Sequence, residues 1–264
     1  MKKTALAIGI LFISALAFGH EFWLQPVKFI LGINEPVNVR VMVGENYKGE
    51  RSDGTKYRIQ QLKHFAVGVA EDYTAHVNGS KSANIHAAFA TAGNHLLAFS
   101  NTGKYISLEA EKFNAYLLEE GLDDIAALRK ERGETGKPGR EYYQRCAKTL
   151  LQVGEGQDDT YALHTGMRME LIPGKNPYAL KEGESVTFKV LFDQAPVNNA
   201  LVLAWNVYKG KTSVTKYRSN AAGEVTFPVQ RRGRWMISSV HMIPYTDAAV
   251  ADWNSFWGSY TFGY

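Results

Sequence analysis

The sequence predicts a mainly β protein built from two Ig-like antiparallel β-sandwich domains, with a small helical insert in or after the first. In residues 37–43, valine alternates with asparagine, arginine and methionine, as expected of a strand with one buried face. Similar short runs follow along the chain, separated by turn sequences such as 101–103 and 220–223. Short strands at this spacing are typical of an antiparallel sandwich.

Two stretches of sequence recur in the same order, which predicts two domains of one type. Residues 32–41 resemble residues 183–190, because each stretch begins with glycine and continues with alternating apolar residues. Residues 93–99 resemble residues 233–239 in the same way. A repeated element in matching order favours duplication of one unit. We therefore predict an N-terminal domain over 20–160 and a C-terminal domain over 161–264.

Strand-like runs account for most of both predicted domains. Besides 37–43, they cover 57–62, 65–70, 83–89, 95–99, 104–108, 167–172, 185–192, 200–207, 212–218, 224–229, 234–241 and 256–264. Between the fifth and sixth of these runs the apolar period becomes helical, and Gly121 and Gly133 are expected C-caps. We predict a helical insert at about 109–151 with three helices, over 109–120, 122–132 and 140–151.

The first 19 residues predict a cleaved secretion signal. Lys2 and Lys3 form a positive n-region, and residues 5–17 form an apolar segment that is too short to span a bilayer. Two cleavage sites are open, and they leave either Phe18 or His20 as the first residue of the mature chain. No later stretch reaches 18 apolar residues, so we expect no membrane span in the mature protein.

Composition argues against several kinds of site. The formal net charge is only +4, and no Lys/Arg cluster is interleaved with aromatic residues, so nothing indicates a nucleic-acid partner. The single cysteine, Cys146, rules out an internal disulfide and a Cys-rich zinc or iron–sulfur site. The sequence contains no protease, EF-hand or hydrolase motif. No pair of carboxylates is marked out for acid–base work, so nothing in the residues indicates an enzyme.

Five spaced motifs carry a resemblance to a known family. They are His20-Glu-Phe-Trp23, the segment Glu-Lys-Phe-x-Ala-Tyr-Leu-x-Glu-Glu-Gly-Leu at 111–122, Gly136-Lys-Pro-Gly-Arg140, Arg234-Trp with Val240-His-Met242, and Asp252-Trp-x-Ser-Phe-Trp257. Together they resemble a periplasmic bacterial family of unknown function that is often labelled a nickel-uptake or cobalt-transport component. The resemblance implies a periplasmic location, a pair of β-domains and a transition metal as ligand.

His20 is the first candidate metal ligand. If cleavage leaves His20 first, its free amine and imidazole Nδ1 can chelate one ion, which suits copper or nickel. If cleavage leaves Phe18 first, the imidazole stands third from the amine, and the terminal tripeptide can hold the metal in a square plane. The competing interpretation is an exposed histidine that binds nothing.

His241 is the second candidate, as a distant partner that completes a three-nitrogen site with His20. It follows Trp235 and Ile237 by period two, so the competing interpretation is a core histidine. The acidic residues that follow, Asp247 and Asp252, are expected to bring an oxygen ligand near it. The other histidines show no spaced partner: we expect surface positions for His64, His76 and His86, a core position for His95 and a loop for His164.

We therefore expect a periplasmic protein that binds or delivers a divalent transition metal (nickel, cobalt or copper) for uptake, with an envelope transport component as partner. The alternative is an Ig-like interaction module for carbohydrate or an envelope protein, in which Trp235, Trp253 and Trp257 form a stacking surface. Copper mono-oxygenases also use an N-terminal histidine, so enzyme activity of that kind stays a further alternative.

Overall fold

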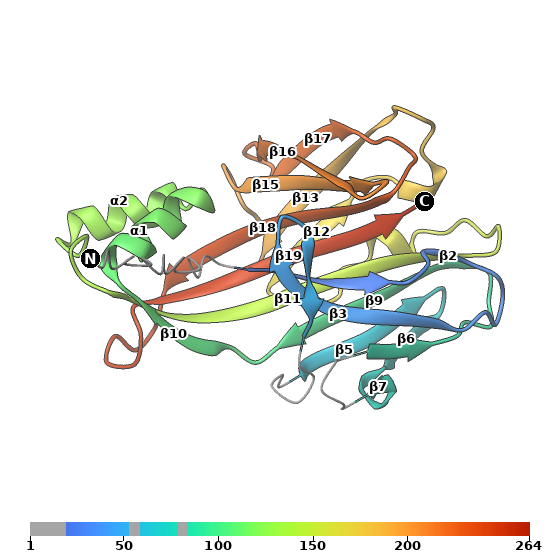
Figure 1. Ribbon diagram of the computed structural model, residues 1–264, viewed down its shortest axis with the longest axis horizontal. Helices are drawn as coiled ribbons and strands as arrows, with labels where there is room; N and C mark the ends of the chain where they lie inside the picture. Colours follow the sequence, from blue (N-terminus) through green and yellow to red (C-terminus); the bar gives the residue numbers. More distant parts are fainter. Residues whose placement is uncertain (1–19, 53–58, 79–83) are drawn as a thin grey trace, which may run out of the picture.

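Three β-sheets stack in the computed structural model, which describes residues 20–52, 59–78 and 84–264 (Figure 1). The predicted mainly β fold is confirmed. The predicted signal over 1–19 and the starts of the predicted strands 57–62 and 83–89 lie outside the described residues.

The central sheet draws strands from both halves of the chain. Its order is β16 (Lys211–Arg218), β15 (Leu201–Tyr208), β18 (Arg234–Pro244), β19 (Trp253–Gly263), β11 (Gly139–Val153), β9 (Gly93–Asn101), β5 (Ile59–Ala66) and β6 (Val69–Asp72), with β10 (Lys104–Leu108) and β2 (Ile30–Leu31) also paired to β11. β11 and β19 run parallel, with Glu141 opposite Trp253 and Thr149 opposite Thr261. This parallel pair joins the N-terminal strands to the C-terminal ones.

A smaller sheet covers each face of the central one. The first contains β1 (Glu21–Pro26), β3 (Val37–Glu45), β4 (Lys48–Arg51), β7 (Val77–Asn78) and β8 (Asn84–Ala87). The second contains β12 (Met169–Pro173), β13 (Ser185–Phe192), β14 (Ala195–Pro196) and β17 (Glu224–Pro228). Among the described residues, the connections contain the short 3-10 helices η2 (Thr74–His76), η3 (Thr160–Ala162) and η4 (Pro177–Ala179).

The apolar cores contain residues from both sides of the predicted boundary at residue 160. Cys146 and Leu150 of β11 belong to the same buried cluster as Phe188 and Phe227. On the other face of the central sheet, Trp23 and Tyr47 pack in one cluster with Trp205, Val207 and Met236. The two halves therefore share a continuous sheet and mixed cores.

The helical insert is shorter than predicted. Helices α1 (Ala110–Glu119) and α2 (Asp123–Glu131) form where expected, and Gly121 and Gly133 follow them with φ of 64° and 65°, the left-handed conformation of a helix end. The predicted third helix over 140–151 is wrong, because this segment is the 15-residue strand β11.

The physical reason for that error is burial on both faces. Every residue of β11 from Arg145 to Val153 is buried, since Cys146 and Leu150 face one outer sheet while Ala147 and Leu151 face the other. A strand covered on both faces loses the alternation of apolar and polar residues, and its apolar run then resembles a helix. Cys146 is a buried free thiol on this strand.

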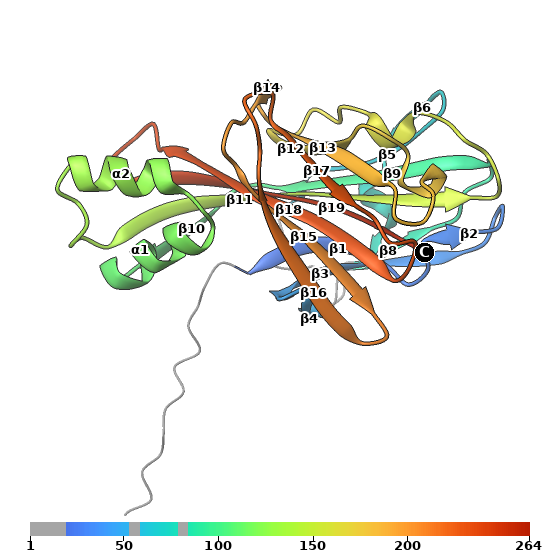
Figure 2. The same ribbon diagram turned by 90° about the horizontal axis from the view of Figure 1, so that it is seen from above.

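Both helices lie at one end of the molecule, beside the ends of the long strands (Figure 2). Phe113, Tyr116 and Ile125 of the helices pack with Trp253 and Trp257 of β19 in one cluster. This packing brings the end of α1 close to the start of β1. No helix in the described part of the chain has the length and apolar character needed to cross a bilayer.

Candidate functional site

Segments from the sequence motifs meet beneath α1. Glu21 of β1, Glu120 at the end of α1, Val240 of β18 and Trp257 of β19 line one small cavity of about 10 Å³, which has room for about one water molecule. These four residues come from four of the five motifs, and the remaining motif ends at Arg140, at the start of β11. The motifs are far apart in the sequence, yet the fold gathers them at one place.

His20 lies at the edge of this place, immediately before β1. Its Nε2 is 3.5 Å from Oε1 of Glu45, and the two side chains are 46% and 50% exposed. The backbone carbonyl of His20 accepts a hydrogen bond from the guanidinium of Arg145. The main chain at His20 is therefore fixed from the interior while its imidazole is open to solvent.

Arg145 is the cation at the centre of the cluster. It is buried on β11, and its guanidinium carbon lies 4.5 Å from the ring centroid of Trp257 and 5.1 Å from that of Tyr143. Arginine stacks readily on aromatic faces and keeps its charge when buried. Arg145 therefore supplies a permanent positive charge beneath the surface.

Three glutamates surround this cation, and all three have a raised pKa. Burial raises the pKa of Glu21 to about 7 and that of Glu120 to about 8. The carboxylates of Glu21 and Glu119 raise the pKa of Glu120 further, whereas the Arg145 guanidinium lowers the pKa values of both Glu21 and Glu120. Burial also raises the pKa of Glu141 to about 7, against hydrogen bonds from Ser255 and Tyr116. Near neutral pH these groups hold protons that an entering cation can displace.

Glu141 is tied into a hydrogen-bond network that fixes the cluster. Its Oε1 accepts hydrogen bonds from the Ser255 hydroxyl and, over 3.3 Å, from the Tyr116 hydroxyl. The Trp257 indole donates to Ser255 Oγ over 3.0 Å, and the Tyr116 and Trp257 rings stack with centroids 5.8 Å apart. α1, β11 and β19 are thereby joined through polar groups as well as through the apolar contacts of the helices.

His241 lies elsewhere, on the opposite face of the central sheet. It is on β18 opposite Phe256, and its ring centroid is 4.4 Å from that of Phe192 on β13. Burial lowers the pKa of His241, while the carboxylates of Asp124 and Asp193 act against that shift. A cavity of about 130 Å³ is lined by His241 and Asp124.

The structure does not bring His20 and His241 together. Strand side chains alternate between faces, so His241 lies on the side of Ile237 and Phe256, which belong to the core beneath the β12–β13 sheet. His20 is bound by Arg145, which contacts Trp257 on the helix side.

The acidic residues expected beside His241 are also engaged elsewhere. Asp252 forms an ion pair with Arg140 over 2.7 Å, and Asp247 accepts a hydrogen bond from the Ala249 amide. Among the residues that the structure describes, no group of three or more histidine, cysteine, aspartate or glutamate side chains is arranged to hold a metal ion.

Sequence reasoning missed most of the cluster around His20. Glu21 and Glu120 were present in the motifs, but their proximity depends on Arg145 and on the path of β11. Glu45 is the last residue of β3, whose pairing with β1 sets Glu21 opposite Gly44. That antiparallel pairing places Glu45 next to His20, and it could not be predicted because β1 was not among the predicted strands.

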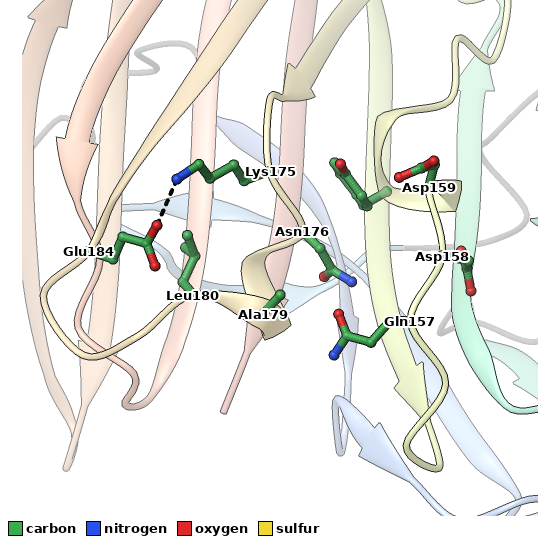
Figure 3. A pocket seen from close by; sticks show the side chains of 9 residues that line it. Gln157, Asp158, Asp159, Lys175, Asn176, Ala179, Leu180 and Glu184 are labelled. Carbon is green, nitrogen blue, oxygen red and sulfur yellow. Dashed lines mark hydrogen bonds and ion pairs between the residues drawn. The ribbon is translucent and has the colours of Figure 1, made fainter.

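A second concave site lies between the loop after β11 and the η4 turn (Figure 3). It is a cleft of about 420 Å³ whose lining is mainly polar and includes Gln157, Asp159, Tyr161 and Asn176. Lys175 and Glu184 pair across its rim over 2.7 Å. Asn176 is only 6% exposed, and its Nδ2 has no hydrogen-bond partner among the described residues.

A family model matches residues 17–243 of the chain, nearly all of the part that forms these sites. The chain belongs to the family described as a domain of unknown function, DUF4198. No curated protein matches this DUF4198 chain.

Solved structures similar to the DUF4198 chain are remote. Murine CEACAM1b has 8% identity and a TM-score of 0.21, covering 90% of this chain and 96% of that one. The chicken CNTN1 FN1–FN3 domains have 6% identity and a TM-score of 0.22, covering 90% and 66%. Trypsin-activated α2-macroglobulin from Escherichia coli has 9% identity and a TM-score of 0.20, covering 94% and 16%. Likenesses this weak carry no argument about the arrangement or the function.

Proposed function

We propose that this protein is a periplasmic binding or delivery protein for a divalent transition metal and that the metal binds at His20. The observation that carries the proposal is the pair of contacts at that residue: Glu45 faces the ring Nε2 at 3.5 Å, and Arg145 binds the carbonyl. With His20 as the first residue, its amine and Nδ1 form the chelate. His241 is not part of this site, because it lies on the other face of the sheet.

Glu45 has a defined part in this proposal. Metal-bound histidines commonly donate their second ring N–H to a carboxylate, which fixes the tautomer and the ring orientation. Glu45 stands at the nitrogen that the chelate leaves free. Arg145 fixes the main chain of the same residue, which reduces the ordering that binding would otherwise require.

The charges around His20 also favour a cation. The carboxyl groups of Glu45 and Glu119 repel that of Glu21, those of Glu21 and Glu119 repel that of Glu120, and the Arg145 guanidinium attracts both Glu21 and Glu120. A divalent ion relieves this repulsion and displaces protons, so binding strengthens as the pH rises through about 7 to 8.

Titration calorimetry with Ni²⁺, Co²⁺ and Cu²⁺ on protein with a verified native N-terminus tests the proposal. We expect His20→Ala to abolish tight binding, and His86→Ala, an exposed histidine on β8, to leave it unchanged. Equal binding by the native protein and His20→Ala would overturn the proposal.

The same titration distinguishes the two possible N-termini. If His20 is first, Glu45→Gln should weaken binding by about 10-fold or more, the usual effect of losing a carboxylate that orients a ligand. If Phe18 is first, the terminal tripeptide supplies all four nitrogens, so Glu45→Gln should change the affinity little. Intact mass of the exported protein identifies the terminus independently.

The polar cleft beside η4 supports a second candidate, the interaction module for carbohydrate or an envelope protein. The exposed amide of Gln157, the carboxylate of Asp159 and the ring of Tyr161 suit a polyhydroxylated ligand. The tryptophan surface expected from the sequence does not serve this role, because Trp235, Trp253 and Trp257 are buried. An NMR titration with soluble peptidoglycan fragments tests the candidate: shifts confined to the cleft and lost in Gln157→Ala support it, and unchanged spectra contradict it.

A further inference from the structure

A chain of three short contacts runs from the surface into the core at the edge of the central sheet. The carboxylate of Glu71 on β6 lies 2.7 Å from Nδ1 of His64 on β5. Nε2 of His64 lies 2.8 Å from Nδ1 of His95 on β9, and Nε2 of His95 lies 3.0 Å from the carbonyl of Thr91. His64 and His95 are 5% and 2% exposed, so His95 confirms its predicted core position and the predicted surface position of His64 is wrong.

The positions of the protons along these three contacts follow from the hydrogen-bonding partners at the two ends. The Thr91 carbonyl only accepts, so His95 carries its proton on Nε2. An ionised Glu71 also only accepts, so His64 carries its proton on Nδ1. Two neutral rings then have no proton left, and two lone pairs face each other across the 2.8 Å contact between the rings. One additional proton at that contact completes all three hydrogen bonds and gives the pair a single positive charge beside Glu71.

We propose that His64 and His95 bind one shared proton and that this proton latches β6 to the body of the sheet. A second proton is disfavoured, because it would set two N–H donors against each other in a buried site. The latch is closed when the shared proton is bound, and it opens when the pH rises and the proton is lost.

The groups around the His64–His95 pair determine which contact breaks when the shared proton is lost. After loss of the proton, His64 can keep its bond to His95 by moving its remaining proton to Nε2. Its Nδ1 lone pair then faces the Glu71 carboxylate, which is 54% exposed and can turn to water at little cost. Glu71 is therefore the group released, and with it β6, whose only sheet partner among the described strands is β5.

Besides Glu71, the titratable neighbours of the pair in the described part of the chain are Tyr73, His76 and Asp158. Tyr73 packs against His64 with ring centroids 5.4 Å apart and stacks on His76 at 3.8 Å. His76 opposes a charge on His64, while Asp158 favours a charge on His95. Burial lowers the pKa of both rings, while the hydrogen bond to Glu71 acts against this shift at His64 and the hydrogen bond to the Thr91 carbonyl acts against it at His95. Phe89 covers both rings, at 4.8 Å from His64 and 4.2 Å from His95.

Nitrogen-15 NMR of the imidazoles in the full mature chain, from pH 4 to 9, tests the proposal. We expect His64 and His95 to titrate with one common midpoint and a combined uptake of one proton, and the Glu71 carboxyl carbon to follow the same midpoint. Two separate midpoints with a full proton each, or no titration of either ring, would overturn it.

Glu71→Gln provides a second variant that removes only the counter-charge at a half-exposed position. The common midpoint should fall by about one pH unit or more, the usual effect of losing an adjacent opposite charge. His86→Gln, at an exposed position on β8, should leave the midpoint unchanged. A midpoint that does not move in Glu71→Gln contradicts the role of Glu71 in the latch.

Discussion

Strand β11 carries two buried cations, Arg145 and Lys148, and their surroundings differ in how completely the charge is balanced. Lys148 forms one ion pair, over 3.2 Å, with the buried carboxylate of Glu170. The other oxygen of Glu170 accepts hydrogen bonds from the Thr165 amide, the Thr165 hydroxyl and the Met167 amide over 2.7–3.1 Å. Arg145, in contrast, faces the carboxyl groups of Glu21, Glu120 and Glu141.

The pKa values of the carboxyl groups record this difference. Burial pushes the pKa of Glu170 upward, but the Lys148 ammonium and the bonds from Thr165 outweigh burial, so that pKa lies below its ordinary value. At Glu21, Glu120 and Glu141 burial prevails, and each pKa is near or above neutrality. The Lys148–Glu170 ion pair has its charges balanced and its oxygens hydrogen-bonded, as expected of a structural role. Carboxyl groups with too little opposing charge, beside an exposed histidine, are instead suited to bind a cation.

The largest expected effect is on the balanced pair. Lys148→Met should destabilise the protein by about 3–5 kcal/mol, because Glu170 would remain buried without a counter-charge. Urea unfolding at pH 7 measures the loss. The double variant Lys148→Met/Glu170→Met should recover part of it, since replacing both charges removes the unpaired group. A loss of unfolding free energy below about 1 kcal/mol for Lys148→Met would contradict a structural role for the Lys148–Glu170 ion pair.

The unbalanced cluster should respond in the opposite direction. Glu120→Gln should stabilise the protein at pH 9 by about 1–3 kcal/mol and change little at pH 4. The full value would approach 1.4 kcal/mol per unit of pKa shift, but the side chain of Glu120 keeps some contact with solvent.

The sign follows from proton linkage. The folded-state pKa of Glu120 is about 8, above the unfolded value of about 4.3, so the folded state binds the proton more tightly. The stability that this carboxyl contributes is present below the unfolded pKa and is lost as the pH rises through about 8. Urea unfolding of wild type and variant from pH 4 to 9 checks the prediction, and parallel curves would contradict it.

How much of this could be predicted from the sequence depended on how many faces of each element are covered. The strands over 37–43 and 185–192 were correctly predicted, because Val37, Val39 and Val41 are buried and their neighbours are at least partly exposed. The predicted helix over 140–151 was wrong because both faces of β11 are covered. Without that strand, the side of the sheet on which Arg145 lies could not be derived.

His64 shows a different limit. Its neighbours Gln61 and Lys63 are polar, and that local composition suggested a surface residue. The period-two alternation of β5 nevertheless places His64 on the same face as Leu62, which is buried. Composition thus concealed a signal that the periodicity carried. His20 could be proposed as a metal ligand from the sequence because the predicted signal cleavage leaves it at or near a free amine. The position of Glu45 beside it depends on the pairing of β1 with β3.

The smallest expected effect concerns an exposed ion pair and calibrates the buried one. Lys175 and Glu184 are 2.7 Å apart, as close as a good ion pair allows, but their side chains are 62% and 33% exposed. Water and salt screen such a pair, and holding two long side chains together costs conformational entropy. Lys175→Met should therefore leave the urea midpoint within experimental error, at low and at high salt, while Lys148→Met shifts it strongly. Both substitutions remove the lysine of a lysine–glutamate ion pair. Equal shifts of the urea midpoint would therefore show that burial does not determine how much each ion pair contributes to stability.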